Sequence, residues 1–373
     1  MNILFLFHNY RDGDGGSSAV DSLIERNKSF GDDYLVVCKF NNTKKTNNIV
    51  TEEEEATIVE FLSRPNVLIN YVRSMQSNIL NHILKLSKKN IPVVMTVVQS
   101  PGYKRLMLSP YEILHSNLIV FIDKTSYNHH IISFIPPQNR VYIYLMSSGR
   151  DDRIQRTEDI FLERNSGTIV YGRGSTLYKC PKDMFKVFDK IGVENKLFRI
   201  VGIPEGDNWV RREAAKRPNV EVYPQLKYDD WFEMCKSFDV FLYQLPDDCY
   251  ASIDGTLGLA ICMRKPVVYM GCDAPKERLV HEESGFIANS VDEMARYATS
   301  LGKDFNLRKS IGEKGRERLL LMAKDNNSEQ RYHEAYEKSF SLPKIRIVPF
   351  SYRLRYLCYC YKDIVRNLLN YYK

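Results

Sequence analysis

The chain has 373 residues, of which 44% are apolar and 27% are charged, a composition typical of a folded globular protein that excludes a disordered one. It is long enough for two α/β domains, because single cores stop growing at about 250–300 residues, and it holds no run of about 18 apolar residues, so we expect no transmembrane helix. The eight cysteines form no C-x-x-C pair, which excludes a recognisable zinc or disulfide framework and favours the cytoplasm.

The first half of the chain alternates strand-like and helix-like stretches. It begins with MNILFLFHNY, which lacks the basic flank and cleavage site of a signal peptide and reads as a first buried strand. Further strands are expected in NVLINYV, IPVVMTVV, LIVFID and NRVYIYL, with a helix in SNILNHILKLSKK. Strands separated by helices imply βαβ units and a mostly parallel sheet.

A polar, irregular segment follows, from about residue 146 to residue 166, and it is the best linker candidate. A second α/β series then begins, with strands expected in TIVYGR, LFRIVGI, VEVYPQ, DVFLYQL, KPVVYMG and SGFIAN. Two Rossmann-like halves joined by a hinge predict an α/β protein with a cleft between its domains. The predicted parts are a first domain at 1–150, a linker at 151–166, a second domain at 167–340 and a C-terminal tail at 341–373.

The start of the second series places two cations six residues apart. A short strand delivers Gly172 and Arg173 to its C-terminal edge, where open α/β sheets bind their ligands. Lys179 follows, just ahead of the helix-like stretch PKDMFKVFDKIG, whose N-terminus favours an anion. The pair therefore suits a diphosphate, although an Arg and a Lys in a surface loop give the same pattern.

The order of the segments after residue 165 resembles the donor domain of retaining GT-B glycosyltransferases, family four in particular. The resemblance covers roughly 165–320: GR-x5-K, LFRIVGIPEGD, NVEVYPQLKYDDWFEMCKSFDVFLYQ, ASIDGTLGLAICM, RKPVVYMGCDAPKE and ESGFIANSVDEMARYATSLGKD. It implies that Arg173 and Lys179 clamp the diphosphate of a nucleotide-sugar, which is a co-substrate, and that no cofactor or metal is needed. Fixed cations would then stabilise the charge that grows on the leaving group.

The chain departs from the family pattern in the loop before RKPVVYM. The family has two glutamates with seven residues between them, which contact the donor sugar and the ribose, and this chain aligns Ala251 and Leu259 with them. Asp254 stands close by and could act as a shifted carboxylate, and Gly255 and Thr256 could form a phosphate-facing turn.

Other positions are assigned by the same resemblance. Gln225 would frame the base, although it could equally be an ordinary polar residue at a strand edge. Glu277 would contact the donor, although it could equally be a charge that stabilises a helix N-terminus. In the first domain, Gly15 and Gly16 would let the backbone approach phosphate or acceptor atoms ahead of a helix. Gln99 stands near the family's expected His and could line the cleft, but a turn before Pro101 explains it equally.

The tail carries most of the excess charge of the chain. The formal net charge is +7, and residues 341–373 hold seven Lys and Arg against the single Asp363. Tyrosines and leucines recur there at helical spacing, which suits either an anionic membrane surface or packing on the protein itself. Nucleic acid is a poorer match, because the charge is confined to one end and no binding module accompanies it.

The resemblance, together with the basic tail, implies a hexosyltransferase-type glycosyltransferase. It would move a sugar, with retention, from a nucleotide-diphosphate sugar to a glycan or lipid-linked acceptor in surface polysaccharide or glycoconjugate biosynthesis, at the inner face of the cell membrane. Two alternatives stay open at this point. One is a non-catalytic GT-B relative that binds glycan or a partner transferase, and the other is a GT-B epimerase or phosphorylase.

Overall fold

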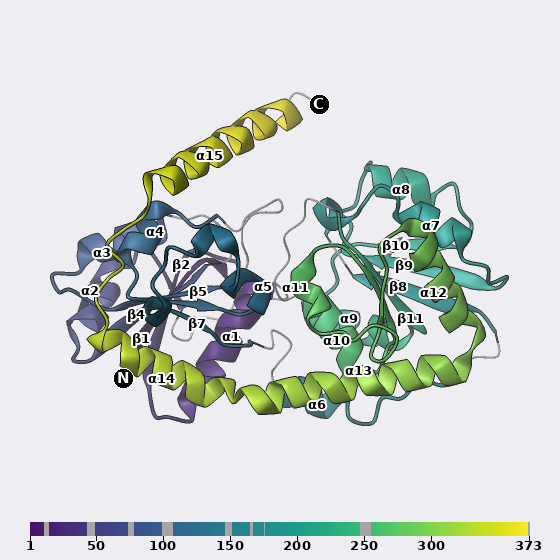
Figure 1. Cartoon of the computed structure of the whole chain (residues 1–373), viewed down its shortest axis with the longest axis horizontal. Helices are drawn as coiled ribbons and strands as arrows, with labels where there is room; N and C mark the ends of the chain where they lie inside the picture. Colours follow the sequence, from purple (N-terminus) through teal and green to yellow (C-terminus); the bar gives the residue numbers. More distant parts are fainter. Residues whose placement is uncertain are drawn as a thin grey trace. The chain divides into compact units, whose positions relative to one another are not determined.

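The computed structural model describes residues 1–10, 15–42, 49–73, 78–98, 107–145, 151–164, 167–174, 176–246 and 255–371. The chain forms two compact units, drawn in Figure 1. Unit 1 contains Met1–Leu145 and Asn327–Lys373, and unit 2 contains Met146–Asn326. Each unit is built on one sheet in which every strand pair is parallel, as the sequence predicts.

The sheet of unit 1 has the strand order β3-β2-β1-β4-β5-β6-β7, so the order reverses between β1 and β4. Its central strands are apolar and buried because helices cover both faces, which is the usual setting of a parallel sheet. The strands are β1 (Asn2–Tyr10), β2 (Asp33–Asn41), β3 (Ile49–Thr51), β4 (Val67–Arg73), β5 (Val93–Val97), β6 (Leu118–Phe121) and β7 (Arg140–Tyr142).

Helices of unit 1 come from both ends of the chain. Those before residue 145 are α1 (Gly15–Lys28), α2 (Glu55–Ser63), α3 (Ile79–Leu86), α4 (Pro110–His115) and α5 (Lys124–Tyr127), with 3-10 turns at His130–Ile132 and Pro137–Asn139. The C-terminal ones are α14 (Ser328–Ser341) and α15 (Phe350–Tyr371). Tyr332 and Tyr336 of α14 are fully buried, and Asn70 of β4 donates a 2.6 Å hydrogen bond to the Tyr336 hydroxyl. The sequence-based boundary at residue 340 therefore differs from the structure, which assigns α14 to unit 1.

Unit 2 repeats the same topology with the order β10-β9-β8-β11-β12-β13, which reverses between β8 and β11. All six strands coincide with segments expected from the sequence. They are β8 (Ile169–Gly174), β9 (Lys196–Val201), β10 (Val220–Tyr223), β11 (Val240–Gln244), β12 (Val267–Met270) and β13 (Phe286–Ile287). The described helices are α6 (Asp151–Arg156), α7 (Met184–Lys190), α8 (Trp209–Ala214), α9 (Tyr228–Lys236), α10 (Gly255–Cys262), α11 (Asp273–Lys276), α12 (Val291–Lys303) and α13 (Phe305–Asn326), with a 3-10 turn at Leu177–Lys179.

The segment expected to be an irregular linker is instead packed into unit 2. It contains α6, and the buried Thr157 hydroxyl accepts a 2.6 Å hydrogen bond from Arg316 of α13. Arg264 donates a 2.6 Å hydrogen bond to the Ile160 carbonyl. Two distant arginines thus fix this segment to unit 2, although most of its described polar side chains are exposed to solvent.

The tail packs on unit 1 over its first half. Ile345, Val348, Tyr352 and Tyr356 are buried in the core of unit 1, and the Tyr352 hydroxyl bonds to both the N–H and the carbonyl of Leu108. These contacts match the intramolecular alternative for this part of the tail. In the part of the chain that the structure describes, no helix is long and apolar enough to cross a membrane.

Candidate functional site

The site that the sequence indicates lies at the carboxyl edge of sheet β10-β9-β8-β11-β12-β13, at the point where the strand order reverses. In open α/β sheets ligands bind in the crevice at such a switch point. β8 ends there with Arg173 and Gly174, and its neighbour β11 ends with Gln244. The N-terminus of α10 joins them, because the Thr256 hydroxyl lies 3.4 Å from the carbonyl oxygen of Gly174. The fold thus brings three segments of unit 2 to one place.

Arg173 is buried, with 1% of its surface exposed, although the sequence alternative placed it in a surface loop. It belongs to β8 itself, and its Nη2 donates a 2.7 Å hydrogen bond to the carbonyl of Lys179. Its guanidinium also lies 5.9 Å from the ring centroid of the buried Tyr243 in β11. Arg173 therefore holds the backbone of the turn that carries Lys179, so the two predicted residues are brought together.

Lys179 ends a 3-10 turn, and its side chain is half-buried. The helix expected directly after it begins only at Met184 and has seven residues. Residues 180–183 separate Lys179 from this helix, and Asp183 stands directly before its first residue. Lys179 therefore does not adjoin the N-terminus of α7, contrary to expectation, and the helix N-terminus that lies beside β8 is that of α10.

The two glycines around Arg173 leave room for aromatic rings. A Cβ at Gly172 would lie 2.1 Å from the ring of Phe238, and a Cβ at Gly174 would lie 2.6 Å from the ring of Trp231. Gly172, predicted to bind the donor, thus has a packing requirement that accounts for it without a ligand. Gly174 is the glycine that borders the N-terminus of α10.

The remaining predicted residues divide into three groups. Gly255 and Thr256 are the first two residues of α10, and they lie at the switch point. Gln225 is exposed in the loop after β10, and Glu277 follows the last residue of α11, where Arg318 donates a 3.0 Å hydrogen bond to its carbonyl. Glu277 is therefore not at a helix N-terminus, the alternative offered by the sequence. Asp254 lies outside the described residues.

In unit 1, Gly15 and Gly16 are the first residues of α1, which follows the carboxyl end of β1 at the reversal of that sheet. This places them in a helix rather than in a loop. Gln99 lies outside the described residues. The Leu259 that aligns with a family glutamate is buried in α10 with 1% exposure, so it serves the core.

Sequence reasoning missed a polar pair at the switch point of unit 2, formed by the buried Gln244 and the half-buried Asp183. Gln244 has 2% exposure, and its Nε2 donates a 2.6 Å hydrogen bond to the Oδ1 of Asp183. The available signals were a glutamine ending an apolar strand and an aspartate before a helix, both of which are common at surfaces. Only the fold places the two side chains together.

A second missed feature is a buried ion pair at the switch point of unit 1. Arg73 ends β4 with 1% exposure, and its Nε donates a 2.8 Å hydrogen bond to Glu112 of α4. Tyr71 donates to the other oxygen of the same carboxylate at 2.8 Å, and Arg73 Nη2 donates to the Met107 carbonyl at 3.0 Å. Burial, and then the Glu112 charge, raise the pKa of Tyr71 well above its usual value. Like Arg173, Arg73 is an arginine at the end of a central strand.

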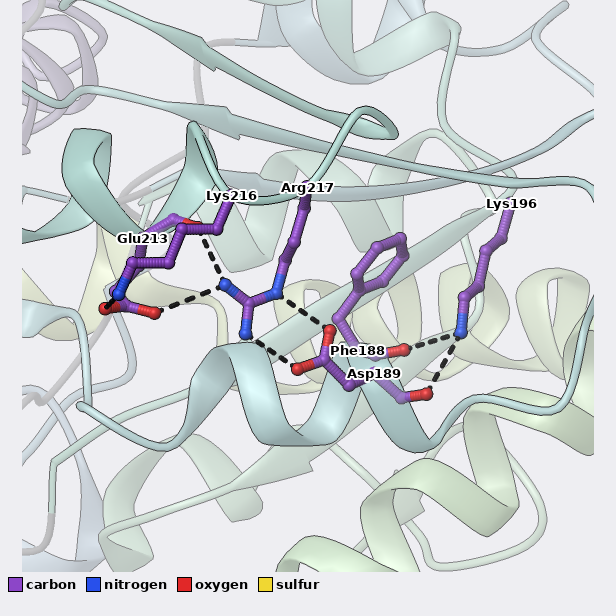
Figure 2. Close-up of polar contacts among 6 residues, drawn as sticks. All are labelled: Phe188, Asp189, Lys196, Glu213, Lys216 and Arg217. Atoms are coloured by element: carbon purple, nitrogen blue, oxygen red, sulfur yellow. Dashed lines mark hydrogen bonds and ion pairs between the residues drawn. The ribbon is translucent and has the colours of Figure 1, made fainter.

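The cluster of charges in Figure 2 lies at the amino ends of the strands of unit 2, away from the carboxyl ends that form the site, since Lys196 is the first residue of β9. Arg217 donates to both oxygens of Asp189, at 2.8 and 2.7 Å, and its hydrogen bond lowers the pKa of that carboxyl. Lys196 Nζ donates to the carbonyls of Phe188 and Ile191 at the end of α7, where such carbonyls lack helical partners. We assign this cluster to anchoring α7, because its polar groups bond to one another and lie away from the carboxyl edge.

Among the residues that the structure describes, no group of three or more His, Cys, Asp or Glu side chains is arranged to hold a metal ion. The described site therefore offers cationic and amide groups, not a carboxylate cluster.

Comparisons with known proteins agree on the fold. No protein-family model matches the chain, and no curated protein matches its sequence. Among solved structures, Anabaena HepE in complex with UDP and glucose has a TM-score of 0.66 at 15% identity, covering 90% of this chain and 99% of that one. An alpha-glucosyltransferase in complex with UDP and DNA has a TM-score of 0.65 at 11% identity, covering 90% of this chain and 99% of that one.

A third similar structure is the lipopolysaccharide outer core galactosyltransferase WaaB, with a TM-score of 0.62 at 13% identity, covering 90% of this chain and 99% of that one. All three are GT-B glycosyltransferases, and identities this low show the fold alone. With two parallel-sheet Rossmann-like domains of seven and six strands, this chain has the GT-B fold.

Proposed function

We propose that the chain is a glycosyltransferase that moves a hexosyl group from a nucleotide-diphosphate sugar, with retention, to a glycan or lipid-linked acceptor. The observation that carries the proposal is the joining of Arg173 and Lys179 at the switch point of unit 2, beside the N-terminus of α10. A diphosphate is the ligand class that such a site suits, because cations and helix N–H groups stabilise its charge. The likeness to structures that hold UDP supports the same choice.

The proposed reaction is a front-face displacement. The bond between the anomeric carbon and the diphosphate oxygen breaks while an acceptor hydroxyl forms the new glycosidic bond on the same face, and the departing phosphate takes the hydroxyl proton. Lys179 would stabilise the growing negative charge, and Arg173 would hold Lys179 in place. Asp254 is the proposed carboxylate near the sugar, Gly255 and Thr256 would face the phosphates, and Gln225 and Glu277 would contact the donor. Gly15, Gly16 and Gln99 would serve the acceptor side.

A thermal-shift screen of nucleotides and nucleotide-sugars tests this function directly. UDP, UDP-glucose and the corresponding purine and pyrimidine compounds are added to the full chain. A ligand at 100 times its dissociation constant should stabilise the protein by about 2.7 kcal/mol, because it binds the folded state alone. A shift with none of them would favour the non-catalytic relative. Turnover without an acceptor sugar, or with free phosphate, would favour an epimerase or phosphorylase.

We further propose that α15 docks on an anionic membrane, which would place the acceptor site at the surface where lipid-linked glycans are built. Four apolar residues at helical spacing are strongly exposed on one face of α15: Phe350 (79%), Leu354 (51%), Leu357 (63%) and Tyr361 (70%). The opposite face carries Tyr352 and Tyr356, which pack into unit 1.

Basic residues flank the exposed face of α15 on both sides. With 3.6 residues per turn, Arg353 falls on one flank, and Arg355 and Lys362 fall on the other, and all three are exposed. An apolar stripe bordered by cations is typical of a helix that lies in the headgroup region of an anionic bilayer. This combination of charge and apolar surface supports the proposal that an anionic membrane is the partner of this face.

Vesicle flotation of a Leu354→Glu, Leu357→Glu double variant tests the membrane proposal. The wild-type chain should float with vesicles that contain phosphatidylglycerol, and the double variant should not, because two carboxylates replace apolar contact and repel the lipid charge. The matched control is Leu321→Glu in α13, a leucine that is equally exposed at 51%. Point variants are preferable to truncation at Ser341, which would also remove buried core residues. Flotation of the double variant with wild-type yield would refute the proposal.

A further inference from the structure

The carboxyl end of β11 holds a buried hydrogen-bond acceptor without a partner. Gln244 Oε1 accepts no hydrogen bond from any described residue, although the side chain is 98% buried. A buried acceptor left without a donor costs free energy, so it calls for an explanation such as a bound ligand. We propose that Gln244 binds the nucleotide-sugar by accepting a hydrogen bond from one of its hydroxyl groups, an inference that rests on the proposed function.

The orientation of the Gln244 amide follows from its other contact. Its nitrogen lies 2.6 Å from Asp183 Oδ1, and an ionised carboxylate can only accept hydrogen bonds. The end that faces Asp183 must therefore be the NH2 group, and a flipped amide would set two acceptors against each other. The group that remains is the carbonyl oxygen, so the missing partner must be a donor such as a hydroxyl.

The register of the sheet places this acceptor beside the proposed diphosphate site. Val240 of β11 pairs with Tyr171 of β8, and side chains two residues apart in a strand share a face. Arg173 and Gln244 therefore project from the same face of neighbouring strands, with Gln244 nearer the carboxyl edge. They also hold the two ends of one segment, since Arg173 bonds to the Lys179 carbonyl and Gln244 bonds to Asp183.

This arrangement gives Gln244 the place of a specificity residue. The cations bind the phosphates, and the neutral Gln244 amide discriminates among the neighbouring hydroxyl groups. In a nucleotide-sugar these hydroxyls belong to the ribose or to the transferred sugar. A site built to bond a hydroxyl rejects an analogue that lacks it, because the protein group is then left buried and unpaired.

The test is a ligand-side double-mutant cycle on the full chain, with dissociation constants from calorimetry. The probes are UDP, 2′-deoxy- and 3′-deoxy-UDP, UDP-glucose and its monodeoxy-glucose analogues. The variant is Gln244→Met, which keeps the side-chain length and replaces the amide oxygen with a thioether, a much weaker acceptor. In the wild type, loss of one particular hydroxyl should weaken binding about three- to tenfold. In Gln244→Met, loss of the same hydroxyl should cost nothing further. A deoxyribose analogue that behaves in this way identifies the ribose, and a deoxyglucose analogue identifies the sugar.

A role limited to holding Asp183 gives a different result. Asp183→Ala removes that contact and keeps the acceptor, so it should retain the wild-type discrimination between the hydroxyl and deoxy probes even if overall affinity falls. If removal of each hydroxyl weakens binding to the wild type and to Gln244→Met by the same factor, the proposed contact does not exist. If the wild type binds no nucleotide or nucleotide-sugar at all, the proposed function itself fails, which separates the two outcomes.

Discussion

Replacing Glu112 with alanine should lower the free energy of unfolding of unit 1 by roughly 3–5 kcal/mol, the cost of removing one partner of a buried ion pair. Arg73 and Glu112 are 1% and 2% exposed, so neither charge can turn to water without opening the core. The same carboxylate accepts hydrogen bonds from Tyr71 at 2.8 Å and from the N–H of Ser109 at 3.0 Å, where it completes the N-terminal capping box of α4. The variant therefore removes the carboxylate that faces a buried cation and also removes the Glu112 half of the α4 capping box.

Urea denaturation read through amide exchange in β4 and β5 isolates unit 1, because a chain of two units need not unfold in one step. Glu53→Ala, at an exposed carboxylate, is the matched control and should stay within about 0.5 kcal/mol of wild type. Glu112→Gln keeps the shape and part of the hydrogen bonding, so its loss of unfolding free energy should lie between those of Glu112→Ala and Glu53→Ala. A loss below about 1 kcal/mol in Glu112→Ala would show that Arg73 reaches solvent or another partner.

Replacing Lys179 with methionine should lower kcat of the proposed transfer about 10²–10³-fold, the usual effect of removing one group that stabilises charge in a transition state. The change should hardly alter stability, because the Lys179 atom that Arg173 contacts is the backbone carbonyl, which the variant keeps. Lys179→Arg should recover part of the activity, since the charge is restored with a different shape.

The neighbouring Lys182→Met is the matched control for Lys179→Met. Lys182 is exposed in the same segment, so its loss changes the net charge equally without touching the turn that Arg173 holds. Activity is measured as nucleotide-diphosphate release from the donor that the thermal-shift screen selects. Equal activity in both variants would remove Lys179 from the donor site and leave Arg173 with a purely structural role.

Much of the fold could be predicted from the sequence because it depends on local pattern. Apolar runs bounded by turn residues identified the central strands of both units, and their alternation with helices implied parallel sheets. The chain order also predicted that Arg173 comes at the carboxyl end of a central strand, the edge where ligands bind.

The contacts of the site depend on segments that are distant in sequence, and no local pattern specifies them. Gln244 meets Asp183 across 61 residues, and Arg73 meets Glu112 across 39. Burial of Arg173 also escaped prediction, because an arginine is usually exposed unless the fold supplies acceptors, here the Lys179 carbonyl.

The tail shows the same division between what sequence and fold decide. Helical spacing and positive charge are local, and they determined that residues 350–371 form an amphipathic basic helix. The face of α15 that packs on the protein is set by Leu108, which lies 244 residues from Tyr352 in the sequence. The backbone N–H and carbonyl of Leu108 both bond to the Tyr352 hydroxyl. The sequence by itself therefore determined the central strands and their order. The tertiary structure decided which side chains are buried, paired or left to face a ligand, because burial and partners arise only when distant segments pack.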